Sequence, residues 1–134
     1  MWHLILIPLF LSIYSDRPKT LEDFRWENRL LIVFDQPDSL KNLFEKQKEA
    51  LEERRLLVFH FKNRKLAESN FPGEVQAESF LKLGSNEKKG WFLIGLDGGV
   101  KRKEEILPPL ESIFATIDAM PMRQSEIRKK RGSG

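Results

Sequence analysis

Three charged residues gather around a proline near the end of the sequence, and side chains of these types could bind a ligand or take part in a reaction. Asp118 precedes the Met120-Pro121 pair, and Arg123 and Glu126 follow it. Because a proline keeps the residue before it out of α geometry, we expect a sharp corner that brings these side chains together. An arginine beside carboxylates can hold a ligand, or it can tie the last helix to the domain. Both interpretations stay open, and the tether is favoured.

A second candidate site is the glycine turn that follows Leu96. Asp97 could bind a cation there or act as a base, although an Asp before glycines more often accepts hydrogen bonds from its own turn. Met120 and Met122 could form an adaptable surface for a partner, and packing of the corner explains them equally well. The predicted binding residues are Asp97, Lys101, Asp118, Met122, Arg123 and Glu126.

Several classes of chemistry are excluded by what the chain lacks. It contains no cysteine, so disulfides, thiolate catalysis and cysteine metal sites are out of reach. His3 and His60 are the only histidines, and we predict no metal site, no cofactor and no catalytic residue. Thiol oxidoreductase and peroxidase activities are also excluded, because both need a cysteine thiol. The alternative hypothesis is a cysteine-free hydrolase or isomerase that uses the charged group at the corner, although no nucleophile with an adjacent base stands out.

The charges of the chain are nearly balanced. Lysine and arginine number 23 against 20 aspartates and glutamates, which leaves a net charge of +3 at pH 7. So small a surplus creates no strong field for a polyanion, and no nucleic-acid partner is predicted. The basic cluster at 128–131 could be a binding patch. We favour the simpler interpretation, that these cations complement the dipole at the end of a helix.

An uncharged apolar segment runs from residue 4 to residue 14. It is shorter than the roughly 20 residues that span a bilayer, and its length suits a secretory signal peptide. We therefore predict a signal peptide at 1–15 and a secreted or periplasmic mature chain without a membrane span. The segment before it, Met1-Trp2-His3, carries no Lys or Arg. The alternative is a buried N-terminal element in a cytoplasmic protein.

Apolar periodicity predicts the secondary structure beyond that segment. Runs of strand length with β-branched and aromatic residues predict strands at 30–34, 55–61, 91–96 and 100–103. Apolar residues at three- and four-residue steps predict helices at 40–54, 74–83 and 107–117, with a short last helix at 122–131. The polar stretch at 62–72 is predicted to be a loop.

This order of elements predicts a fold of the α/β class. A strand–helix–strand unit with parallel strands is followed by an antiparallel hairpin and a closing helix. That is the βαβ plus ββα arrangement of a thioredoxin-like core, a four-stranded mixed sheet with helices on both faces. The length leaves room for a single domain, which we place at 16–131, and 132–134 are predicted to be a flexible tail.

Three segments together resemble a known family. They are Trp26–Phe34, Leu93–Lys101 and Ile117–Arg123, with Glu126 just beyond. They are similar to a domain of unknown function found in small secreted bacterial proteins and in animal matrix proteins of the sushi-repeat type. The resemblance covers about 21–128. It implies a thioredoxin-like fold, frequent export from the cytoplasm and no established enzymatic activity.

The chain departs from the thioredoxin pattern where the redox chemistry would lie. The loop Asp35-Gln36-Pro37-Asp38 stands where a thioredoxin carries its thiol pair, and Lys88-Lys89-Gly90 stands where it carries a cis-proline. The leading hypothesis is therefore an exported, non-redox, thioredoxin-like domain that binds another macromolecule. We expect that partner to be a protein.

Overall fold

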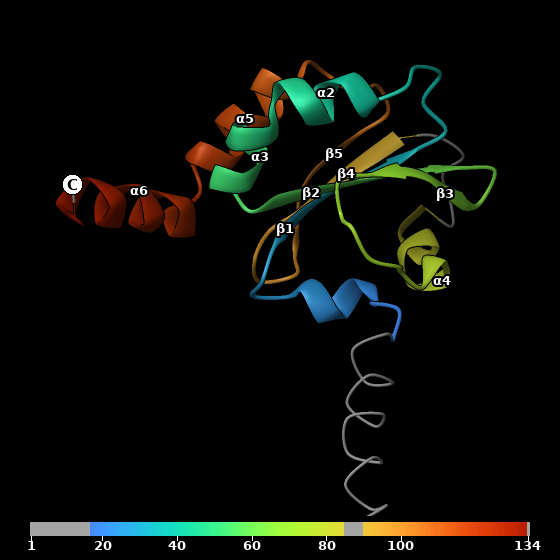
Figure 1. The fold of residues 1–134 in the computed structure, drawn as a ribbon, viewed down its shortest axis with the longest axis horizontal. Coiled ribbons are helices and arrows are strands. Elements are labelled where there is room, and N and C mark those ends of the chain that lie inside the picture. Colours follow the sequence, from blue (N-terminus) through green and yellow to red (C-terminus); the bar gives the residue numbers. More distant parts are fainter. Residues whose placement is uncertain (1–16, 85–89, 134) are drawn as a thin grey trace, which may run out of the picture.

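A five-stranded mixed sheet lies at the centre of the computed structural model, which describes residues 17–84 and 90–133 of the chain (Figure 1). The predicted signal peptide at 1–15 lies outside the described residues. The strands are β1 (Arg29–Phe34), β2 (Leu56–Lys62), β3 (Lys65–Ser69), β4 (Gly90–Ile94) and β5 (Val100–Glu104). The helices are η1 (Leu21–Phe24), α2 (Lys41–Lys46), α3 (Lys48–Glu53), α4 (Ala77–Leu81), η2 (Lys82–Gly84), α5 (Leu110–Asp118) and α6 (Pro121–Ser133).

The strand order is β3-β2-β1-β4-β5, with β1 in the middle. β1 pairs in parallel with β2 and antiparallel with β4, and β4 pairs antiparallel with β5. The predicted parallel unit and the predicted hairpin are therefore both present. α2 and α3 are separated by Gln47 alone, so the predicted helix at 40–54 is almost continuous.

The sheet has five strands, and the prediction of four was wrong. The additional strand, β3, lies in the stretch that was predicted to be a loop, and it pairs antiparallel with β2. Its sequence is polar because it forms an edge of the sheet and buries little. The turn before it, Asn63-Arg64, has φ angles of 49° and 66°. A type I′ hairpin turn has positive φ at both of its central residues, and a glycine commonly takes the second position. Arg64 takes that position here, so the sequence gives no glycine signal for the turn.

Helices cover both faces of the sheet, as predicted. In β1, Leu31 and Val33 face one core, and Leu30, Ile32 and Phe34 face the other. α2, α3 and α5 cover the first face, and η1 and α4 lie against the second (Figure 1). This alternation follows from the two-residue period of a strand, and it explains why β1 reads as apolar throughout.

The segment before α4 carries a second difference from the sequence prediction. The helix expected at 74–83 begins only at Ala77. Val75 instead forms an isolated parallel bridge with Lys19, whose N–H donates to Glu74 O at 3.0 Å. This bridge holds the start of the described chain against the second face of the sheet.

No helix within 17–84 or 90–133 combines the length and the apolar character that crossing a membrane requires.

Candidate functional site

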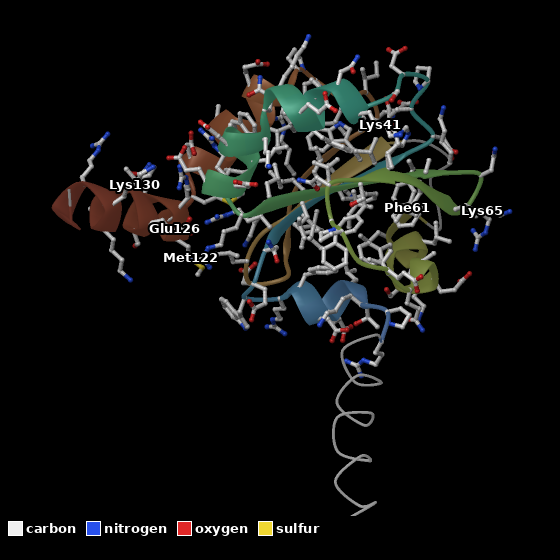
Figure 2. The ribbon with its side chains drawn as sticks, viewed as in Figure 1. Lys41, Phe61, Lys65, Met122, Glu126 and Lys130 are labelled. Carbon is white, nitrogen blue, oxygen red and sulfur yellow. The ribbon has the colours of Figure 1, made fainter. Side chains whose placement is uncertain are left out.

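The six predicted binding residues form two groups that share one buried side chain, Arg29. α5 ends at Asp118 and α6 begins at Pro121, so the predicted corner between them is present. The first group is a network of ion pairs behind this corner. The second lines a pocket between the corner and the β4–β5 hairpin. Figure 2 shows Met122 and Glu126 on the first turns of α6, at the side of the molecule away from Lys65.

Arg123 lies at the centre of the ion-pair network and is buried. Its Nε donates to Asp118 Oδ1 at 3.0 Å, and its terminal nitrogens contact Glu53 Oε1 at 3.1 Å and Glu126 Oε1 at 3.6 Å. The same side chain thus contacts one carboxylate from each of α3, α5 and α6. All three sequence-predicted members of the group come together here, and Glu53 joins them.

Two further arginines complete the network. Arg54 binds the Asp118 carboxylate through two hydrogen bonds of 3.0 and 2.8 Å. Arg29, at the start of β1, binds the Glu126 carboxylate through bonds of 3.3 and 2.9 Å, and it also donates to Arg54 O at 3.0 Å. Paired geometry of this kind makes the strongest arginine–carboxylate contacts. The charges of these six side chains balance, and Lys130 pairs with Glu53 from the surface at 3.4 Å. The network ties α6 to β1 and α3.

The carboxylates of the network stay ionised because their arginine partners outweigh burial. Burial raises the pKa of Asp118, but hydrogen bonds from Arg54 and Arg123 bring it below its usual value. Burial likewise raises the pKa of Glu126, and the bond from Arg29 more than reverses the effect. The group therefore offers no carboxylic acid poised to give up a proton near neutral pH.

The hairpin supplies the second group. Asp97 accepts a hydrogen bond from the Gly99 N–H at 2.9 Å, which closes the turn, and another from the Lys101 ammonium at 2.8 Å. The hydrogen bond from Lys101 lowers the pKa of Asp97 below its ordinary value. Asp97 thus acts within its own turn, and it also fixes the position of the Lys101 side chain.

A bulge in β5 directs Lys101. Along the β4–β5 ladder, Leu93 pairs with Arg102 and the next residue, Ile94, pairs with Val100, so Lys101 is the additional residue. Bulges of this type re-aim a side chain and are common beside functional sites. The chain of Lys101 crosses Gly95, where an added Cβ would lie only 2.5 Å from Lys101 Cε. The glycine is therefore needed for Lys101 to lie as it does.

These elements enclose a pocket of about 240 Å³, which we call the hairpin–corner pocket. Its lining residues come from β1, the hairpin and the corner: Arg29, Leu96, Asp97, Lys101, Met120 and Met122, with Gly95 and Pro121 between them. Three of the six sequence-predicted residues contribute to it. Arg29 is 1% exposed, and its Nε is buried without a hydrogen-bond partner among the described residues.

Two large apolar side chains are exposed at this end of the sheet. Met122 is 45% exposed on its rim, and Trp26 is 55% exposed. The backbone N–H of Trp26 donates to Leu96 O at 2.6 Å, which holds this tryptophan at the end of the sheet where the pocket lies. Its φ of 69° is unusual for a bulky residue. Neither Trp26 nor Arg29 was among the predicted site residues, although an arginine at the head of an otherwise apolar strand is a signal that could have been used.

The opposite end of β1 lies beside a histidine and a glutamate. His60 is buried; its Nε2 accepts from the Gln36 N–H at 3.2 Å, and its Nδ1 lies 2.9 Å from Glu68 Oε2. Nδ1 must therefore carry the proton when the ring is neutral. Glu68 also accepts from Ser39 Oγ and the Leu40 N–H. Burial raises the pKa of Glu68, but these hydrogen bonds together lower it to about 2.

The contacts of this cluster lie between its own members and the backbone of the loop after β1. It braces that loop against β2 and β3. In the part of the chain that the structure describes, no three histidine or carboxylate side chains are arranged to hold a metal ion.

The match to a family model covers most of the described domain. Residues 20–126 match the model of the domain of unknown function DUF4174. No curated protein and no solved structure matches the chain. The matched range contains every strand of the sheet, the hairpin–corner pocket and all six members of the ion-pair network. Since this range is well over half of the sequence, the chain belongs to the DUF4174 family.

Proposed function

We propose that this chain is a non-enzymatic binding module that recognises a protein partner through the hairpin–corner pocket and its rim. One observation carries the proposal: the exposed Met122 lines a preformed, largely apolar pocket, and the exposed Trp26 is hydrogen-bonded through its backbone to Leu96 of the same lining. Tryptophan and methionine are enriched at the cores of protein interfaces. Methionine in particular adapts its shape to different partners.

The size of the pocket favours a protein partner over a cofactor. Sites for small molecules enclose about 300–1,000 Å³. The hairpin–corner pocket encloses about 240 Å³, which suits a single side chain. Interfaces commonly gain most of their affinity from a few such side chains that are buried in pockets of the partner.

The walls of the pocket are held in place before any partner arrives. The bulge and Asp97 fix Lys101, and the bond between Arg29 and Glu126 fixes the floor. A preformed site loses less conformational entropy on binding, so more of the contact energy is left as affinity. The ion-pair network therefore supports recognition by holding Arg29 in place at the floor of the pocket.

The proposal includes a thioredoxin-like core and export. If β3 is set aside, the strand order is β2-β1-β4-β5, with a βαβ unit followed by a ββα unit. This order supports a thioredoxin-like core to which β3 is added at one edge. The uncharged apolar segment at 4–14 supports export. The redox role of such a fold is absent from the proposal because the chain has no cysteine.

Site-specific cross-linking in the native host tests the proposal. A photoreactive amino acid replaces Met122 in one variant and Lys65, at the far edge of the sheet, in the other (Figure 2). We expect a discrete protein adduct from position 122 and none from position 65. The protein in that adduct is then purified. Met122→Glu should weaken its affinity by about tenfold or more, and Lys65→Glu should leave it unchanged. Loss of affinity to the same extent in both variants would refute the assignment.

A further inference from the structure

The hydrogen-bonding groups of the hairpin–corner pocket are unevenly used. Asp97 already accepts from Gly99 and Lys101, and both oxygens of Glu126 bind Arg29 behind the floor. The donors are not exhausted. An ammonium group has three N–H donors, and the structure assigns one of those of Lys101 to Asp97. Lys101 thus has N–H donors for which the structure assigns no acceptor among the described residues.

Arg29, at the floor of the pocket, also has a donor without an acceptor. Both of its terminal nitrogens are engaged, but the buried Nε–H has no partner among the described residues. Buried donors without acceptors are rare in folded proteins, and each one calls for an explanation. This N–H is closed off in the structure, but Arg29 lines the pocket, so a small shift of its side chain would bring the N–H to a ligand atom.

The rest of the lining is apolar. Leu96, Met120 and Met122 form the walls, and the aliphatic part of Lys101 lies across Gly95 beside them. An occupant therefore needs an acceptor and an apolar group together. In about 240 Å³ both must belong to one residue. An internal Asp or Glu carries its carboxylate at the tip of its own side chain, so its apolar group must come from a neighbour. A C-terminal apolar residue carries both on a single Cα.

We infer that the hairpin–corner pocket binds the C-terminal residue of a partner chain, an apolar residue with a free α-carboxylate. The carboxylate lies against Lys101 and Arg29, and the apolar side chain lies against Met120 and Met122. A charged acceptor makes stronger hydrogen bonds to these cationic donors than an amide carbonyl does. The inference rests on the proposed function, because it names the part of the partner that enters the pocket.

Asp97 has a positioning role in this scheme. It holds the Lys101 ammonium by one N–H and leaves the others for the ligand.

The test uses isotope-labelled full-length chain and three synthetic probes, followed by NMR. The probes are an acetylated tripeptide that ends in leucine with a free carboxylate, the same tripeptide as its C-terminal amide, and an amidated peptide with leucine beside an internal aspartate. We expect the free acid to shift the amide signals of Gly95, Leu96 and Met122 saturably. The amide and the internal acid should bind about tenfold more weakly.

Matched lysine variants give the control. Lys101→Met keeps the aliphatic stem but removes the ammonium, and we expect it to weaken binding of the free acid about tenfold. Lys103→Met changes an exposed lysine on the same strand that does not line the pocket, and binding should stay the same. Thermal melting of both variants establishes that each is folded.

The other outcomes are equally definite. Equal affinity for the free acid and the amide would overturn the role of the carboxylate, and an absence of saturable shifts would overturn the inference as a whole. A cross-link from position 122 that maps to an internal segment of the partner would leave the proposed function standing while the inference falls. If the free acid bound but position 122 gave no protein adduct, the carboxylate site would stand while the proposed function falls.

Discussion

Arg29 and Glu126 stand 97 positions apart in the chain, yet they are joined by two hydrogen bonds of 3.3 and 2.9 Å. The pair connects the first residue of the central strand to the second turn of the last helix. Arg29 also forms part of the floor of the hairpin–corner pocket. The contact that fixes α6 therefore also shapes the candidate binding site, and a change in one should be felt in the other.

Replacement of Arg123 by alanine should destabilise the fold. The buried guanidinium binds Asp118 and Glu53, and its loss leaves Asp118 with Arg54 alone and Glu53 with the exposed Lys130. Removing one member of a buried ion pair typically costs about 3–5 kcal/mol of unfolding free energy. Chemical denaturation followed by circular dichroism measures the loss. The control is Arg128→Ala on the exposed side of the same helix, which should change stability by less than about 0.5 kcal/mol. A parent-like melting curve for Arg123→Ala would exclude the tether.

The stability of the domain should fall in acid because of Glu68. The pKa of this carboxyl is about 2 in the folded chain, below the ordinary value of 4.5. A lowered pKa contributes stability above the unfolded value, and that stability is lost as the pH falls from about 4.5 toward 2. The shift corresponds to about 3 kcal/mol. Unfolding free energies measured between pH 6 and pH 2 for the parent and for Glu68→Gln test this.

The glutamine variant should lose a distinct part of the slope in that window, and the lowered pKa values of Asp118, Glu126 and Asp97 account for the slope that remains. Glu78→Gln, at an exposed position, should keep the slope of the parent. A parent-like slope in Glu68→Gln would mean that other carboxylates carry the acid sensitivity.

Gly95→Ala should displace Lys101 without unfolding the domain. The new methyl group would collide with Lys101 Cε, the far part of a flexible side chain that can move aside. We expect a stability change within about 1 kcal/mol. Because the Lys101 bond lowers the pKa of Asp97, this pKa should rise toward its ordinary value, as seen in an NMR titration of the carboxyl signal. Gly132→Ala, where the new methyl group meets open space, is the control. A rise in the Asp97 pKa in that variant as well would refute the explanation.

Trp26→Gly should separate binding from folding. The backbone at Trp26 has a φ of 69°, which a glycine adopts without strain, so the loss of side-chain contacts is offset by relief of about 1 kcal/mol or more. We expect unchanged thermal stability together with weaker affinity for the cross-linked partner. Isothermal titration with that partner measures the second effect. Full affinity in Trp26→Gly would remove this tryptophan from the interface.

Export can be tested directly on the protein from its native host. We expect a mature chain that begins near Asp16 and is recovered outside the cytoplasm. Intact mass and N-terminal sequencing of separated cell fractions give the answer. A full-length chain in the cytoplasm would contradict the predicted signal peptide, and the search for a partner would then move to that compartment.

The parts of the fold that periodicity could predict are those whose residues bury a continuous face. The alternating faces of β1 and the stripe of Ile113, Phe114 and Ile117 on α5 belong to this kind. β3 does not, because an edge strand buries little and its turn uses Arg64 where a glycine would have been informative. The local sequence pattern does not reveal such an element, because its structure depends on its pairing with β2.

The candidate site was predictable only in part, and for a related reason. Asp118, Arg123 and Glu126 are close in sequence around a proline, so their meeting could be predicted from local geometry. Arg29 and Trp26 reach the site through contacts with α6 and with Leu96, which are remote in sequence. An arginine at the head of an apolar strand indicates that Arg29 has a buried polar contact, but the neighbouring residues do not indicate with which partner. The grouping of Asp97 and Lys101 with Met122 likewise depends on how the hairpin packs against the corner.

The bulge at Lys101 has a consequence for solubility. An outer strand exposes unpaired backbone N–H and C=O groups, and it can template growth of the sheet by another copy of the chain. Irregular pairing and lysines counter such growth, and β5 has both: the bulge and the exposed side chains of Lys101 and Lys103. A variant that made β5 regular and apolar would lose the placement of Lys101, and it would also gain an edge prone to fibrillar aggregation. The local irregularity that places Lys101 thus also disfavours edge-to-edge growth of the sheet.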